Sequence, residues 1–246
     1  MKDVFLRSGE RMDDLQYDGY RLIQNPSLFC FSTDAVLLSA FVRIPRDSRV
    51  LDLGAGNGIL TVLMYSRVPQ AHYAAVEIQR ELYDLLVRNL RLNRMMDVQA
   101  VHGDLRDAPK LFGTHNDICV CNPPYEKAGS GRAARSRVAD GARRETLVTF
   151  EEIVHSASAL LRTGGRFYIV HRSARLAELM SALRAHRLEP KVLQLVTAVP
   201  GREPKTCLIM AQKDAAEGMR VLPELTLFTE DGAESTRMKQ IYRRED

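Results

Sequence analysis

The feature that most limits the possible folds is a glycine-rich segment, Asp52–Gly58, with the sequence DLGAGNG. An apolar run before it predicts a buried strand over Arg49–Leu53, and a periodic apolar run after it predicts a helix from Ile59 to about Arg67. Glycine lets a backbone turn tightly and lets a ligand approach it closely. A strand, a glycine-rich turn and a helix in this order predict an α/β fold with a ligand site at the carboxyl end of the strand.

Strand and helix patterns alternate along most of the remaining chain. Two short strands are expected around a turn at Asn25-Pro26, a helix capped by Thr33 or Asp34 follows, and Gly164-Gly165 is expected to end a later helix. Further strands are expected at 71–76, 98–101, 117–121, 167–170, 192–196, 207–211 and 225–228, and helices at 35–42, 80–93, 149–161, 175–185 and 236–242. This alternation predicts a mostly parallel sheet with helices on both faces.

Composition narrows the class of protein. The chain has 246 residues, 45% of them hydrophobic and 27% charged, as in an ordinary globular protein. No apolar run approaches 18 residues and the N-terminus has no apolar signal segment, so we expect a cytoplasmic protein without a membrane partner. The cysteines show no metal-ligand spacing, so we expect reduced thiols and no metal at Cys30, Cys119, Cys121 and Cys207.

Acidic residues end the next two predicted strands. Glu77 is placed where a carboxylate can accept hydrogen bonds from both hydroxyls of a ribose, and Asp104 follows the third strand. A dinucleotide-binding motif would have its third glycine where this chain has Ile59. The pattern instead resembles motif I of the Rossmann-like S-adenosylmethionine (SAM) methyltransferases. A glycine-rich turn that binds nothing is the alternative interpretation.

The segment Asn122–Tyr125, with the sequence NPPY, ends the fourth predicted strand. Alone it could be a simple turn. Downstream of the segment that resembles a SAM-binding loop, it resembles the N-P-P-Y/F motif of amino methyltransferases. These enzymes modify planar nitrogens of adenine, cytosine, guanine or glutamine. The Asn122 side chain and the Pro123 carbonyl would accept hydrogen bonds from the amine, Pro124 would complete the motif, and Tyr125 would stack on a flipped base.

A third resemblance concerns the substrate. The segments 20–26 and 29–38, with 9–15 and 234–242, are similar to bacterial tRNA adenine-N6 methyltransferases that act on valine tRNA beside the anticodon. The chain departs from them at Ser32, where glycine is expected, and in a long arginine-rich stretch after Tyr125. The resemblance implies a seven-stranded sheet whose last strand is antiparallel, SAM as cofactor with S-adenosylhomocysteine as product, and tRNA as partner.

The resemblance also implies a set of site residues. The catalytic residues would be Asn122, Pro123, Pro124 and Tyr125. The cofactor would contact Phe31, Thr33, Asp52, Gly54, Ala55, Gly56, Asn57, Gly58, Glu77, Ile78, Asp104, Leu105 and Asn122. Phe31 and Thr33 also fit a plain helix start, and the two functions can coexist.

A basic segment follows the NPPY motif. Residues 126–144 are rich in glycine, alanine, serine and arginine, so we expect a mobile surface insertion. Its cations either belong to a solvated loop or contact RNA phosphates next to the target base. The residues concerned are Lys127, Arg132, Arg135, Arg137, Arg143 and Arg144.

We expect two parts in the chain and one favoured activity. Residues 1–47 are predicted to form an extension, a short hairpin plus a helix, that packs on a methyltransferase domain at 48–246. The favoured function is methylation of an adenine N6 in tRNA by a monomeric enzyme. Methylation of a release-factor glutamine or of a ribosomal RNA base, and a SAM-binding RNA module without catalysis, remain as alternatives.

Overall fold

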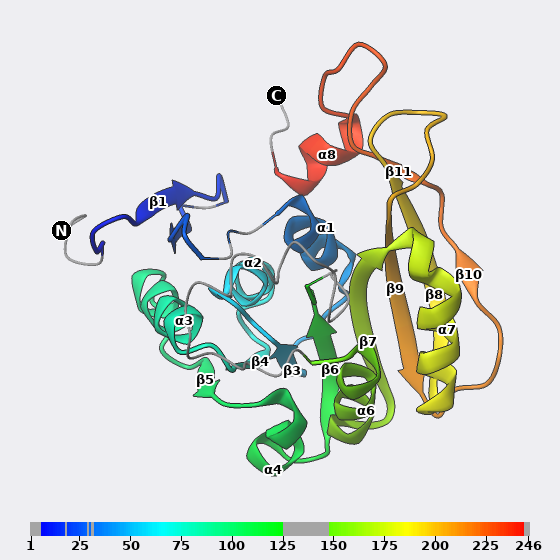
Figure 1. Cartoon of the computed structure of the whole chain (residues 1–246), viewed down its shortest axis with the longest axis horizontal. Helices are drawn as coiled ribbons and strands as arrows, with labels where there is room; N and C mark the ends of the chain where they lie inside the picture. Colours follow the sequence, from blue (N-terminus) through cyan, green and yellow to red (C-terminus); the bar gives the residue numbers. More distant parts are fainter. Residues whose placement is uncertain (1–5, 18, 29, 31, 125–147, 244–246) are drawn as a thin grey trace, which may run out of the picture.

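The structure is a computed structural model that describes residues 6–17, 19–28, 30, 32–124 and 148–243. Within these residues a central sheet runs in the order β10-β8-β9-β7-β6-β3-β4-β5, and β11 pairs with β8 off that path (Figure 1). The strands are β3 (Arg49–Leu53), β4 (His72–Glu77), β5 (Gln99–His102), β6 (Asn116–Cys121), β7 (Leu161–Arg172), β8 (Leu188–Thr197), β9 (Thr206–Lys213), β10 (Arg220–Val221) and β11 (Leu225–Thr226). The sheet therefore holds the seven predicted strands, β3 to β9, and two short strands beside β8.

The direction of the strands decides where a ligand can bind. Neighbours among β5, β4, β3, β6 and β7 are parallel, whereas β9 is antiparallel to both β7 and β8. The expectation that the strand near Cys207–Ala211 is antiparallel is confirmed. Five parallel strands thus end at one edge of the sheet, the edge at which open α/β sheets bind their ligands.

Helices cover both faces of the sheet, as predicted (Figure 1). Helices α1 (Thr33–Phe41), α2 (Ile59–Arg67), α3 (Arg80–Leu92) and α8 (Thr236–Ile241) pack in one apolar cluster, and α4 (Ala108–Phe112), α6 (Phe150–Leu160) and α7 (Leu176–Ala185) pack in another. The short 3-10 turns are η1 (Leu105–Asp107) and η2 (Ser173–Arg175). Residues of β6 alternate between the clusters, Val120 in the first and Cys119 in the second, because successive side chains leave a strand on opposite faces.

The N-terminal hairpin differs from its prediction. It pairs β1 (Arg11–Asp14) with β2 (Arg21–Gln24), and the turn lies between these strands rather than at Asn25-Pro26. The Asn25 side chain instead accepts a hydrogen bond from the Ser27 backbone at 3.0 Å, which makes this stretch a turn after β2. Ser32 occupies the cap position of α1, so the predicted caps Thr33 and Asp34 are wrong.

The expected helix stop at Gly164-Gly165 is also wrong. Helix α6 ends at Leu160, and both glycines lie within β7. A Cβ at Gly165 would lie 2.8 Å from the Arg162 carbonyl oxygen and 3.1 Å from that of Asn116. The pairing of β6 with β7 is irregular at this point, and only glycine permits so close an approach of the backbones.

Other expectations concern the whole chain. In the part of the chain that the structure describes, no helix is long and apolar enough to cross a membrane. All four cysteines are free, and burial raises the pKa of the Cys207 thiol to about 12.

Leu22 and Leu37 from the N-terminal segment share an apolar cluster with Val62 and Tyr168. The division of the chain after residue 47 stays a prediction.

Candidate functional site

The segments that the sequence singles out meet at the carboxyl edge of the parallel strands. The register pairs Leu53 with Val76 and Asp52 with Val120, so the residues after β3, β4 and β6 leave the sheet together. The backbone N–H groups of Gly54 and Ala55 both donate to the Val76 carbonyl at 3.0 Å. These bonds fix the start of the glycine-rich loop against the end of β4.

The three glycines of this loop differ in what surrounds them. All have positive φ angles, +72° at Gly54, +58° at Gly56 and +87° at Gly58. A Cβ at Gly54 or Gly56 would meet nothing within 4 Å, whereas a Cβ at Gly58 would lie 2.6 Å from Leu86 Cδ1. Gly58 is thus needed for packing on α3, and the first two glycines leave space in which a ligand can approach the backbone.

Glu77 is oriented by backbone N–H groups. Its side chain accepts from Gly56 N at 2.8 Å on Oε2 and from Gln79 N at 2.8 Å on Oε1. Glu77 is 5% exposed, while the next residue, Ile78, is 43% exposed. A carboxylate held in this way retains lone pairs for two hydroxyl donors, and Ile78 offers an apolar surface beside it.

Asp52 lies beneath the loop, where it is 2% exposed. Its carboxylate accepts a hydrogen bond from Thr61 Oγ1 at 2.7 Å. Burial raises the pKa of Asp52 to about 7, and the nearby charge of Glu77 raises this pKa as well. A cationic ligand beside Asp52 would favour its ionised form.

Asn57 carries a buried donor that the described residues do not satisfy. The residue is 1% exposed, and its Oδ1 accepts weakly from Ile59 N at 3.3 Å. Its Nδ2 has no hydrogen-bond partner within the described part of the chain. Buried polar groups are rarely left unpaired, so an acceptor on a bound cofactor fits this position.

Asp104 has a clear structural function. Its Oδ1 accepts from Arg106 N at 2.9 Å at the start of η1, and its carboxylate also forms an ion pair with the Arg106 side chain. The Arg106 hydrogen bond lowers the pKa of Asp104. Arg106 further contacts Glu152 at 3.1 Å, which joins the end of β5 to the start of α6. Arg106 is not among the residues predicted from the sequence, although an arginine two residues after a strand-end acid is a visible signal.

The NPPY segment is described as far as Pro124. The Asn122 side chain is partly buried and makes no hydrogen bond within the described residues, Pro123 is buried, and Pro124 is exposed. Thr33, at the start of α1, is exposed, and Leu105 is buried. The remaining predicted site residues lie outside the described residues: Phe31, Tyr125, Lys127, Arg132, Arg135, Arg137, Arg143 and Arg144.

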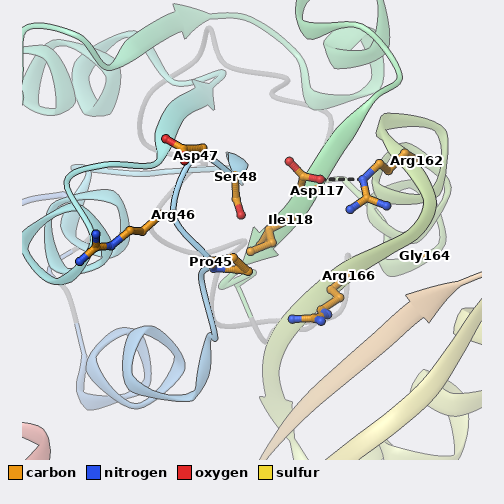
Figure 2. Close-up of a pocket in the computed structure, with 9 residues that line it drawn as sticks. All are labelled: Pro45, Arg46, Asp47, Ser48, Asp117, Ile118, Arg162, Gly164 and Arg166. Atoms are coloured by element: carbon orange, nitrogen blue, oxygen red, sulfur yellow. Dashed lines mark hydrogen bonds and ion pairs between the residues drawn. The ribbon is translucent and has the colours of Figure 1, made fainter.

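A polar cavity of about 300 Å³ lies at the opposite edge of the sheet (Figure 2). It is lined by residues that precede β3, begin β6 or lie in the first half of β7, among them Arg46, Asp117 and Arg166. Two of the lining residues form an ion pair, in which Arg162 Nε lies 2.6 Å from Asp117 Oδ1. Because ligands of open α/β sheets bind at the carboxyl ends, this cavity is separate from the candidate site. Within the described residues no cluster of side chains is suited to hold a metal ion.

The fold is that of the class I SAM-dependent methyltransferases. A crystal structure described as a predicted O-methyltransferase from Agrobacterium tumefaciens superimposes with a TM-score of 0.70 at 22% identity and covers 85% of this chain and 95% of its own. A 16S rRNA N2 G1207 methyltransferase from Thermus thermophilus gives a TM-score of 0.59 at 24% identity, over 85% of this chain and 52% of its own.

The sequence itself assigns the family. Residues 20–188 match the family model of the methyltransferase small domain, and this chain belongs to that family. A tRNA1(Val) (adenine(37)-N6)-methyltransferase from Porphyromonas gingivalis is 30% identical over 72% of this chain and 71% of its own. One of the same name from Shewanella frigidimarina is 32% identical, and the match covers 64% of each chain, slightly less than two thirds of that relative.

Proposed function

We propose that this protein transfers a methyl group from SAM to the N6 amine of an adenine in tRNA, the adenine at position 37 beside the anticodon of valine tRNA. The observation that carries the proposal is the placement of Asn122-Pro123 at the end of β6, next to the glycine-rich loop after β3. The names of the curated relatives support the choice of substrate.

The cofactor site is proposed from residues already described. Glu77 would bind the ribose hydroxyls, because its two oxygens are held in place by Gly56 and Gln79. Gly54 and Gly56 would admit the cofactor to the backbone, and Asp52 would stabilise its positive charge. When bound, SAM supplies an electrophilic methyl on a sulfonium and leaves as S-adenosylhomocysteine.

The amine would be held by the residues after β6. An adenine amine is a poor nucleophile because its lone pair is delocalised into the ring. Asn122 Oδ1 and the Pro123 carbonyl would accept its two N–H groups and direct the lone pair at the methyl carbon. A nitrogen–carbon bond would form as the carbon–sulfur bond breaks, and the amine would then lose one proton to solvent. These residues would lower the reaction barrier by positioning the amine, an effect that is typically worth several kcal/mol.

RNA recognition would involve cations outside the described residues. The basic segment that begins two residues after Tyr125 is proposed to contact phosphates, and Tyr125 to stack on the extruded base. Phe31 and Thr33 are proposed to border the methionine end of the cofactor, and Asp104 with Leu105 its adenine.

The test is methyl transfer from labelled SAM. An unmodified valine tRNA transcript should accept one methyl per molecule, recovered as N6-methyladenosine after digestion. A transcript with guanosine in place of adenine 37 is the matched control and should accept none. Equal labelling of both transcripts would overturn the choice of nucleotide. Labelling of ribosomal RNA or a release factor, with none in tRNA, would overturn the choice of substrate.

A further inference from the structure

A buried asparagine in helix α3 links the N-terminal hairpin to the glycine-rich loop. Asn89 is 0% exposed. Its Oδ1 accepts from Ile23 N at 2.7 Å, and its Nδ2 donates to the Ile23 carbonyl at 3.0 Å and to the Asn57 carbonyl at 2.8 Å. One amide thus contacts strand β2 on one side and the loop after β3 on the other, with both donor hydrogens used.

A second asparagine, one helical turn later, provides a comparison. Asn93 Oδ1 accepts from Arg21 N at 3.0 Å, and Asn93 Nδ2 donates to the Arg21 carbonyl at 2.8 Å. Residues four apart on a helix and two apart on a strand have similar spacings, so the two amides bind β2 as a neighbouring strand would. Within the described residues the Asn93 side chain forms no hydrogen bond with the loop; its Nδ2 also donates to the Asn89 carbonyl at 2.8 Å.

Asn89 bonds to the loop directly before a residue with a left-handed backbone conformation. The Asn57 carbonyl belongs to the residue before Gly58, whose backbone is left-handed and packs against Leu86. Asn57 is 1% exposed, so solvent cannot replace the donor that its backbone carbonyl would lose. Leu86 packs against this turn of the loop, and Asn89 donates a hydrogen bond to it. Two residues of α3 about one helical turn apart therefore hold the same turn in place.

We propose that Asn89 is a positioning residue for the cofactor site. It holds the Asn57-Gly58 turn in the geometry that binds SAM, and Ile23 of the hairpin holds Asn89 in the rotamer that reaches the loop. This inference rests on the proposed function only for the identity of the ligand. The hairpin is thereby part of the support of the cofactor site, although it is remote in sequence from the SAM motif.

The experiment compares Asn89→Ala with Asn93→Ala in the full chain. Both variants remove two hydrogen bonds to β2, so amide hydrogen exchange of the hairpin should rise in both. Exchange of the peptide that covers residues 54–58, measured without SAM, should rise in Asn89→Ala alone. By calorimetry SAM affinity should fall at least about 10-fold in Asn89→Ala and change less than about 2-fold in Asn93→Ala, because only the first variant loses the loop contact.

Two outcomes would overturn the proposal: loop exchange that rises equally in both variants, or loop exchange that is unchanged in Asn89→Ala. If Asn89→Ala does not fold, Asn89→Asp serves instead, since it keeps the acceptor for Ile23 N while an ionised carboxylate loses the donors to both the Ile23 and the Asn57 carbonyls. Wild-type protein that binds no SAM would contradict the proposed function, while the exchange measurement would still decide the positioning by Asn89.

Discussion

The carboxylate of Glu77 accepts a hydrogen bond from the Gly56 backbone at 2.8 Å, so the acid that ends β4 also fixes the loop that follows β3. A single side chain thereby joins the two segments proposed to surround the ribose. Its second oxygen is held by Gln79 N, which prevents rotation of the group away from the site. Such preorganisation lowers the cost of ordering on ligand binding.

Replacing Glu77 by alanine should weaken SAM binding by about 1.5–3 kcal/mol, which is roughly 10- to 150-fold in affinity. The change removes the acceptor proposed for two hydroxyls and the support of Gly56. Calorimetry measures the affinity, with Asp107→Ala as a control that removes an exposed acid near the same edge. Unchanged affinity in Glu77→Ala would exclude Glu77 from the site.

Replacing Asn122 by alanine should lower turnover at least about 100-fold and leave SAM affinity nearly intact, because it removes a contact made to the reacting amine. Asn122→Asp keeps an acceptor at the same place and should retain more activity than the alanine variant. Single-turnover methylation of tRNA, measured beside SAM binding, checks both. Near-normal turnover in Asn122→Ala would contradict the acceptor mechanism.

The raised pKa of Asp52, about 7, predicts a pH-dependent cofactor affinity. Below pH 7 the folded protein without ligand holds a proton on Asp52 that a cationic ligand must displace, so SAM affinity should rise with pH up to about 7 and then level off. Without SAM the sign for stability is opposite. The folded state binds this proton more tightly than the unfolded state, so the Asp52 contribution falls as pH rises from about 4 to 7.

Asp52→Asn provides the check on both dependences. It should flatten the affinity profile between pH 5.5 and 8, measured by calorimetry, and remove the corresponding part of the pH dependence of Tm. A wild-type profile that is already flat over this interval would show that Asp52 does not titrate with the ligand.

Substitutions at two glycines of the loop should differ in their effect on stability. Gly56→Ala and Gly58→Ala both place a Cβ on a left-handed residue, at a cost of about 1–2 kcal/mol each. Only Gly58→Ala also meets Leu86, which adds about 1–3 kcal/mol. Thermal unfolding should therefore show the lower Tm for Gly58→Ala. Leu86→Ala alone should cost about 2–5 kcal/mol because Leu86 is fully buried, and its effect combined with Gly58→Ala should be less than additive if the clash is the cause.

RNA binding should depend on the basic segment. Replacing Arg132, Arg135 and Arg137 by alanine should flatten the salt dependence of tRNA affinity by up to about 2–3 units of slope. Arg46→Ala with Arg166→Ala, at the cavity on the opposite edge of the sheet, is the control and should leave the slope unchanged (Figure 2). Identical slopes in all three proteins would assign RNA binding to another surface.

The sequence predicted those elements whose local pattern agrees with their tertiary setting. The bounds of β3 and α2 match the prediction, because a buried apolar run and a helical repeat both flank the glycines. Strand β1, with the sequence RMDD, has no strand pattern of its own and forms by pairing with β2. Gly165 was predicted to end a helix. In the structure it allows the backbones of β6 and β7 to approach closely, and no local sequence pattern records a contact between such distant segments.

The candidate site was predictable to a similar extent. Glu77 and Asn122 follow strands that the sequence predicts, so their common edge followed from the topology. Asn89 was missed because leucines dominate the periodicity of α3, although a polar residue within that apolar face is itself a signal. Its partners, Ile23 and Asn57, lie far away in the sequence and could not be identified before the fold was known.

The contact of Arg106 with both Asp104 and Glu152 bears on how this scaffold can diverge. Glu152 belongs to the capping box of α6, which begins just after residues 125–147, and Pro124 continues directly from β6. The two ends of the intervening stretch are thus attached to β6 and to the capped start of α6. An exchange of residues 126–147 between relatives would leave these contacts and the NPPY segment in place, so the stretch proposed to contact RNA can change without altering the residues proposed to hold the cofactor and the amine.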